Sequence, residues 1–162
     1  IFLPKIIYNI ETRKSKTAND LHEAQKLKEK AEKKLNDYKK IIELANQLIE
    51  DLYAFKTTKV LFKPTKASVI PFRSTKDEFI SYFIASNDVC AEDKGFALEP
   101  WKSIEFENYS ITNSEESIIA VGNYFFENSN SQKIKVEYTF GYIFDETGKL
   151  KINLHHSSIP FK

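Results

Sequence analysis

The last strand-like segment of the chain carries two side chains suited to acid–base and hydrogen-bonding chemistry. Within Lys149–Ser158, every second residue from Leu150 to Leu154 is apolar, and the same face continues with His156 and Ser158. Side chains two residues apart on a strand share a face, so we expect His156 and Ser158 to point into the cavity that these aliphatic residues fill. Buried polar groups need partners or a ligand. The alternative is that His156 only hydrogen-bonds a carbonyl group in the core.

The inventory of ligands and motifs argues against a zinc enzyme and against a serine triad. A catalytic zinc ion usually takes three His, Cys or carboxylate ligands, whereas the chain has three His and one Cys. His155 and His156 are neighbours on a strand and point in opposite directions, so they cannot both bind one ion. Ser157 and Ser158 are equally badly placed to pair with a neighbouring imidazole. No Gly-rich phosphate loop or His-Glu-x-x-His motif is present. Carboxylates could still build a site for a harder ion, but no clustered ligand pattern supports one. We therefore expect no structural or catalytic zinc ion and no cofactor.

Four segments rich in Ile, Val, Tyr, Phe and Thr are predicted to form the sheet that positions these residues. They are Ser103–Ile111, Ile118–Phe126, Ile134–Phe144 and Leu150–Ser158. Short connections rich in Asn, Ser, Asp and Gly separate them, which is typical of an antiparallel meander.

Helices are predicted before the sheet. A stretch without Pro or Gly carries apolar residues at steps of three and four, which predicts a long helix over residues 20–54, starting with a capping carboxylate at Asp20. Thr75 and Glu78 form a capping box that opens a second helix. Helices followed by a meander indicate an α+β fold, with the helices covering one face of a curved sheet.

Length and composition favour one domain. The chain has 162 residues, of which 41% are hydrophobic and 29% charged, and no apolar run is long enough for a membrane span. Residues 1–63 carry 14 Lys and Arg against 9 Asp and Glu. The lysines alternate with glutamates at helical pairing distances, so we interpret this face as solvated rather than as a nucleic-acid surface. We divide the chain into an extension, residues 1–18, and a domain, residues 19–162. Because it begins with Ile rather than Met, we expect a processed product or an excised piece.

Seven segments, in this order, resemble the iota-class carbonic anhydrases of bacteria and algae. The segments lie within residues 60–162 and are Phe62–Ser68, Pro71–Arg73, Ser81–Phe83, Glu92–Phe96, Gly122–Phe126, Val136–Tyr142 and Leu154–Pro160. The closing His-His-Ser-Ser-x-Pro motif also occurs in the wider superfamily that contains the association domain of calcium/calmodulin-dependent kinase II.

The resemblance implies a cone-shaped fold like that of nuclear transport factor 2, dimerised through its sheet, and reversible hydration of carbon dioxide to bicarbonate without a metal ion. Carried over by position, it implies that Thr65, Tyr82, His156 and Ser158 hold bicarbonate and water, with His156 as proton acceptor or relay. It is compatible with a plastid or a bacterial periplasm as the location.

A non-catalytic role stays open, because this fold hosts many unrelated functions. In that alternative the cone binds a small anion, or the sheet assembles an oligomer. The presence of all four expected site residues, Thr65, Tyr82, His156 and Ser158, favours the interpretation as an enzyme over a non-catalytic module.

Overall fold

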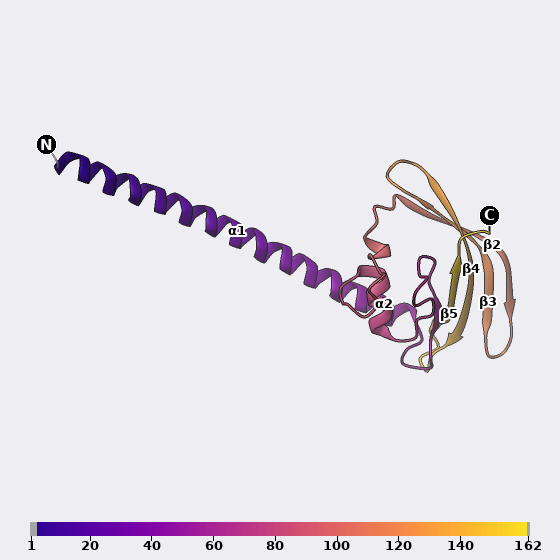
Figure 1. Ribbon diagram of the computed structural model, residues 1–162. Coiled ribbons are helices and arrows are strands. Elements are labelled where there is room, and N and C mark those ends of the chain that lie inside the picture. Colours follow the sequence, from indigo (N-terminus) through magenta and orange to yellow (C-terminus); the bar gives the residue numbers. More distant parts are fainter. Residues whose placement is uncertain (1–2, 162) are drawn as a thin grey trace. The chain divides into compact units, whose positions relative to one another are not determined.

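Four long antiparallel strands and one short strand form a single curved sheet with the order β1-β5-β4-β3-β2 (Figure 1). The structure is a computed structural model that describes residues 3–161. The strands are β1 (Leu61–Lys63), β2 (Ser103–Asn113), β3 (Ile118–Glu127), β4 (Lys133–Phe144) and β5 (Leu150–Ser158). The meander from β2 to β5 confirms the antiparallel sheet expected from the sequence, and with it the α+β class.

Strand β1 lies outside the four segments that the sequence predicts for the sheet. It has only three residues, too few for a recognisable alternation, and it pairs in parallel with β5 so that Phe62 lies beside His155 and Lys63 beside His156. Phe62 is buried, whereas Leu61 is half exposed. This pairing brings the chain that leads to Thr65 next to the strand that carries the histidines.

Helix α1 spans Leu3–Leu52 and therefore begins well before the predicted residue 20. Its first turn contains Pro4, which a first turn tolerates, and nothing after it interrupts the helix. Asp20 consequently lies inside the helix and does not cap it. Residues 1 and 2 of the expected extension lie outside the described residues. The boundary between residues 18 and 19 stays a prediction.

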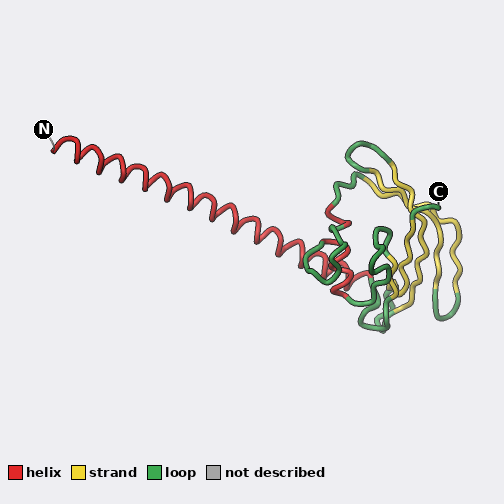
Figure 2. Tube along the Cα trace, in the orientation of Figure 1, coloured by secondary structure: helices red, strands yellow, loops and turns green. Residues whose placement is uncertain are grey.

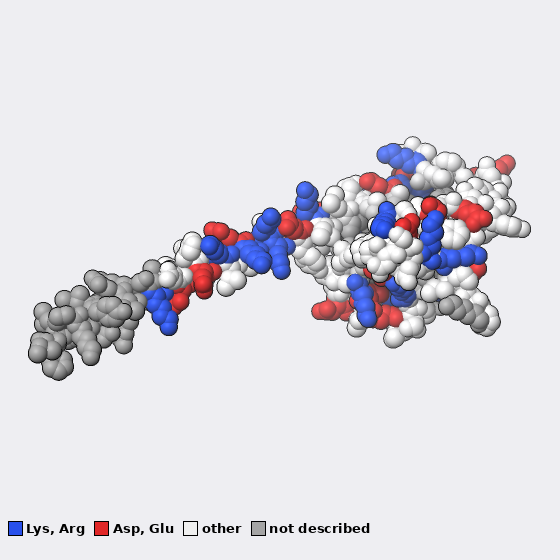
Figure 3. All heavy atoms as spheres, turned by 90° about the horizontal axis from the view of Figure 1, so that it is seen from above, with Lys and Arg blue, Asp and Glu red and all other residues white. Residues whose placement is uncertain are grey.

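By its internal contacts the chain divides into the units Ile1–Ile41 and Ile42–Lys162. Over residues 19–41 of the first unit, positive and negative side chains are interspersed along the helix (Figure 3), and Lys28 and Glu32 form an ion pair one turn apart, at 3.8 Å. This mixture of charges agrees with a solvated face. Across residues 3–161, no helix combines the length and apolarity that crossing a membrane demands.

Helix α2 spans Lys76–Ile84 and starts where the capping box predicted. The Thr75 hydroxyl accepts a hydrogen bond from the backbone N–H of Glu78, and the Glu78 carboxylate accepts one from the backbone N–H of Thr75. The helix ends at Ala85, which adopts the left-handed conformation. Phe79, Ile80 and Tyr82 on its buried face join the core.

The core of the second unit has two clusters of buried side chains. Figure 2 shows helical and loop segments on one side of the strands of this unit. The first cluster gathers the end of α1, β1 and α2 around Phe79. The second is formed by β3 and β4 around Tyr124 and Val136. A short 3-10 helix, Phe96–Leu98, brings Phe96 against both clusters. Aromatic rings supply most of this packing, and the ring contacts include an edge-on pair of Tyr53 and Phe79 at 4.9 Å.

Candidate active site

A one-residue bulge in β5 decides which of its side chains face the core. Gly141 pairs with Leu154, but the next residue, Tyr142, pairs with Ile152, so that Asn153 has no partner across the strands. An extra residue shifts the alternation of every residue beyond it by one position. Ile152 packs against the core, and the next inward side chains are those of His155 and Ser157.

The expectation that His156 and Ser158 point into the cavity is therefore wrong. His156 is exposed and lines a groove on the other face of the sheet, beside Lys63. Ser158, two residues further along, shares that outward face. Their neighbours His155 and Ser157 supply the imidazole and the hydroxyl to the core side. Thr65 and Tyr82, the other two expected site residues, do line the same pocket.

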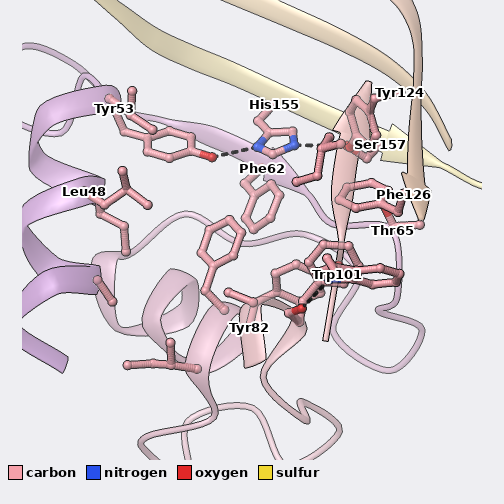
Figure 4. Close-up of a pocket in the computed structure, with 18 of the residues that line it drawn as sticks. Leu48, Tyr53, Phe62, Thr65, Tyr82, Trp101, Tyr124, Phe126, His155 and Ser157 are labelled. Atoms are coloured by element: carbon pink, nitrogen blue, oxygen red, sulfur yellow. Dashed lines mark hydrogen bonds between the residues drawn. The ribbon is translucent and has the colours of Figure 1, made fainter. Parts of the chain in front are cut away.

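The pocket has a volume of about 420 Å³ and a predominantly aromatic and aliphatic wall. Apolar side chains come from the end of α1, from β1, α2, the sheet and the segment that precedes β2, with Leu48, Phe62, Trp101 and Phe126 among them (Figure 4). Leu48, Ile104 and Phe106 are more than 45% exposed and mark the opening. Only five hydroxyl groups and one imidazole interrupt this surface: Tyr53, Thr65, Tyr82, Tyr124, His155 and Ser157.

Four of these groups form one chain of hydrogen bonds. The Tyr53 hydroxyl lies 2.8 Å from Nδ1 of His155, and Nε2 of His155 lies 3.0 Å from the Ser157 hydroxyl (Figure 4). Ser157 in turn is hydrogen-bonded to the Tyr124 hydroxyl. Ser157 is 1% exposed and Tyr124 is 5% exposed, so the chain runs through the interior and ends at the pocket.

Burial controls the protonation of these groups. It lowers the pKa of His155 to about 3, with a smaller contribution from the charge of His156, so that the imidazole is neutral at neutral pH. Burial also raises the pKa of Tyr82 and of Tyr124. Hydrogen bonding by the Thr65 hydroxyl acts on both phenols in the opposite direction. The phenols therefore stay protonated and can donate hydrogen bonds into the pocket.

The loop that carries Thr65 is fixed by one carboxylate. The Glu92 carboxylate accepts hydrogen bonds from the backbone N–H groups of Ser68 (2.7 Å), Val69 (3.0 Å) and Ile70 (2.7 Å). These bonds lower the pKa of Glu92 to about 2. The same carboxylate lies 3.3 Å from Nη2 of the buried Arg73. Directly after Thr65, the backbone N–H of Lys66 lies 3.4 Å from the Tyr82 hydroxyl.

Sequence reasoning missed Tyr53, Tyr124, His155 and Ser157. An isolated glycine in a strand often marks a bulge. Gly141, which pairs with the closing strand, is therefore the sequence signal that could have indicated a change in the alternation of β5. Tyr53 lies past the end of a helix and Tyr124 in the middle of a strand, where the sequence does not distinguish a core tyrosine from a site tyrosine. Among the side chains that the structure describes, those of residue 16 and residues 19–161, no three His, Cys, Asp or Glu are close enough together to hold a metal ion.

Comparison with solved structures defines the class of the fold. A domain from Thiobacillus denitrificans, assigned to the association domains of calcium/calmodulin-dependent protein kinase type II, superposes with a TM-score of 0.51 at 10% identity, over 74% of this chain and 93% of that one. At that identity the likeness concerns the fold alone.

Two closer similarities, together with a family model, identify the family. The model of the metal-independent carbonic anhydrases matches residues 10–159. The crystal structure of a cyanobacterial iota-carbonic anhydrase complexed with bicarbonate superposes with a TM-score of 0.71 at 34% identity, over 75% of this chain and 74% of that one. A metal-independent carbonic anhydrase of Nostoc sp. (strain PCC 7120) is 36% identical over 120 residues, 74% of this chain. The chain belongs to the metal-independent carbonic anhydrase family. It matches 58% of the length of this curated relative.

Proposed function

We propose that this chain catalyses the reversible hydration of carbon dioxide to bicarbonate in the pocket between the sheet and the helices. The observation that carries the proposal is the convergence of Thr65, Tyr82, Tyr124 and Ser157 hydroxyls with the His155 imidazole in an otherwise apolar pocket. An apolar wall suits carbon dioxide, which has no charge. A small set of oriented donors suits bicarbonate, and such donors act more strongly where water is excluded.

The reaction makes one C–O bond while one C=O π bond of carbon dioxide opens, its electron pair moving onto oxygen, and one proton passes from the attacking water to another water. The oxygen of a water molecule bonds to the carbon of carbon dioxide, one O–H bond of that water breaks, and its proton leaves to a second water molecule and then to solvent. Negative charge develops on the oxygens of the product. Preorganised O–H donors at Thr65, Tyr82 and Tyr124 stabilise this charge without reorganising.

The proton leaves through the opening rather than through His155. The lowered pKa of this imidazole prevents it from holding a proton at neutral pH. Nδ1 of His155 is hydrogen-bonded to the Tyr53 hydroxyl. Tyr53 is only 6% exposed and offers the proton no path to solvent. His155 and Ser157 thus orient the donors, and this role replaces the proton acceptor that the sequence led us to expect at His156.

The donor set also supports a mechanism without a metal ion. Neutral Thr, Ser and Tyr hydroxyls are poor ligands for zinc, which prefers thiolate, imidazole and carboxylate. The description of the family is metal-independent, and the cyanobacterial iota-carbonic anhydrase was crystallised with bicarbonate. We extend both properties to this chain: metal-free catalysis, and bicarbonate bound by the pocket hydroxyls.

Stopped-flow hydration of carbon dioxide, measured after exhaustive chelation with metal analysis of the same sample, tests the proposal. We expect turnover in metal-free protein. Turnover that disappears on chelation and returns with zinc or manganese would disprove the metal-free mechanism. Binding of bicarbonate without any turnover would favour the non-catalytic binding module.

We also propose a homodimer formed through the outward face of the sheet. The support is the family resemblance together with the apolar residues Ile119 and Leu154 on that face, since Ile119 is 42% exposed. Light scattering on the purified protein tests it, and Ile119→Lys is expected to shift the mass from dimer to monomer. A monomeric mass for the unmodified protein would exclude the dimer.

A further inference from the structure

Tyr53 is attached to the strand that carries the site histidine. Its backbone N–H donates to the carbonyl of Ile49 at 2.9 Å, and the next residue, Ala54, donates to the carbonyl of Ile152 in β5 at 2.9 Å. Its ring lies parallel to the His155 ring, with centroids 6.1 Å apart and planes inclined by 12°. The end of α1 and β5 therefore hold phenol and imidazole in fixed register.

The hydrogen of the Tyr53 hydroxyl has one acceptor. Among the hydrogen bonds of the described side chains, the Tyr53 oxygen forms one with Nδ1 of His155 and no other. A buried hydroxyl without an acceptor is costly, and the ring nitrogen of a neutral imidazole that carries no hydrogen is an acceptor. Tyr53 therefore donates, and Nδ1 accepts.

The hydrogen bond that Tyr53 donates fixes the donor-to-acceptor direction of every later hydrogen bond in the series from Tyr53 to Tyr124. A neutral imidazole that accepts at Nδ1 carries its hydrogen on Nε2, and Nε2 faces the Ser157 hydroxyl at 3.0 Å. Ser157 then accepts from His155 and turns its own hydrogen toward the Tyr124 oxygen. The Tyr124 hydrogen remains for Thr65 or for a bound oxygen atom. If all these hydrogen bonds ran in the opposite direction, the Tyr53 hydrogen would have no acceptor.

We propose that Tyr53 is a positioning residue that holds His155 in its neutral Nε2–H form, so that Ser157 donates to the Tyr124 oxygen and the Tyr124 hydrogen points toward the bicarbonate oxygens. The role in catalysis rests on the function proposed above, whereas the tautomer does not. Tyr53 itself touches the imidazole and not the substrate. The lowered pKa of His155 agrees with this arrangement, because protonation of Nδ1 would remove the only acceptor for the Tyr53 hydrogen.

The tautomer is measured directly by long-range proton–nitrogen NMR of the histidine rings in the full-length chain. The three histidines are assigned with His22→Gln, His156→Gln and His155→Gln. In the unmodified protein we expect His155 to show a protonated Nε2 and an unprotonated Nδ1. In Tyr53→Phe, which removes one oxygen and keeps the ring, Ser157 becomes free to donate to Nε2, so we expect an Nδ1–H form to appear. We also expect kcat to fall about tenfold, with a smaller change in KM.

Tyr142→Phe is the matched control, because the Tyr142 hydroxyl makes no hydrogen bond with any side chain that the structure describes. We expect its spectrum and its kcat to match those of the unmodified protein. A protonated Nδ1 in the unmodified protein overturns the proposal, even if Tyr53→Phe fails to fold. An unchanged tautomer in folded Tyr53→Phe also overturns it. If carbon dioxide is not hydrated at all but the Nε2–H form is present, the proposed function fails while the assignment of Tyr53 as the residue that holds this tautomer stands.

Discussion

Gly141 pairs directly with Leu154 across β4 and β5, and a Cβ atom on Gly141 would lie only 2.9 Å from Cβ of Leu154. The pairing beyond this point skips Asn153. This close approach accompanies the bulge, which places His155 and Ser157, rather than their neighbours, in the pocket. The chemistry of the site thus depends on the pairing of Leu154 with Gly141, which lies 13 residues earlier in the chain, and not on the closing strand alone.

Adjacent residues on β5 provide a direct test of this orientation. Ser157→Ala removes the hydroxyl that orients the Tyr124 donor, and we expect kcat/KM for hydration to fall about a hundredfold, the effect of a misdirected oxyanion donor. Ser158→Ala removes the same atom from the opposite face and should leave kcat/KM unchanged. The stopped-flow assay compares the two. Equal losses in both variants, or a loss confined to Ser158→Ala, would contradict the assigned faces.

The α+β class, the meander, the second helix and the closing strand as the source of the site were all predictable from the sequence. Each rests on a local pattern: the capping box at Thr75, the alternation along the strands, and the motifs that carry the family resemblance. The choice of face in β5 was not predictable from that strand alone, since the bulge is a property of its pairing with β4. The long-range contact of Tyr53 with His155 joins residues 102 positions apart, and no local pattern encodes it.

Gly141→Ala is expected to destabilise the fold and the site together. The added methyl group would meet Cβ of Leu154 at 2.9 Å and Oδ1 of Asn153 at 3.0 Å, so the two strands must separate. Overpacking of this kind typically costs about 1–3 kcal/mol. Urea unfolding should show a lower midpoint, and hydration by the remaining folded protein should be slower because His155 and Ser157 shift. An unchanged midpoint would mean that β5 accommodates the methyl group without moving.

Glu92→Gln is expected to loosen the loop that carries Thr65. It removes a charge-assisted acceptor from three backbone N–H groups and from Arg73, and such bonds contribute about 1.5–3 kcal/mol each. We expect a loss of roughly 2 kcal/mol or more in the free energy of unfolding at pH 7. Glu99→Gln, which breaks the more exposed ion pair with Lys66, is the control and should cost less than about 1 kcal/mol. Similar losses in both variants would contradict a special role for Glu92.

Acidification should destabilise the protein through His155. Burial lowers the pKa of this imidazole to about 3 in the folded chain, while in the unfolded chain it stays near 6.5. Between these values the unfolded state binds a proton that the folded state does not, so stability decreases as the pH falls below about 6.5, by up to about 1.4 kcal/mol per pH unit. Glu92 acts in a lower window, because its pKa of about 2 matters only once the pH falls below its ordinary value of 4.5. Urea unfolding at pH 7, 6 and 5 therefore isolates the histidine.

His155→Gln should flatten this dependence on pH relative to the unmodified protein, because the residue that titrates only in the unfolded state is gone. His156→Gln, one position away on the exposed face, should retain it. A slope that survives in His155→Gln and disappears in His156→Gln would place the buried imidazole at the other histidine, and the hydrogen-bond chain from Tyr53 to Tyr124 would then be wrong as well.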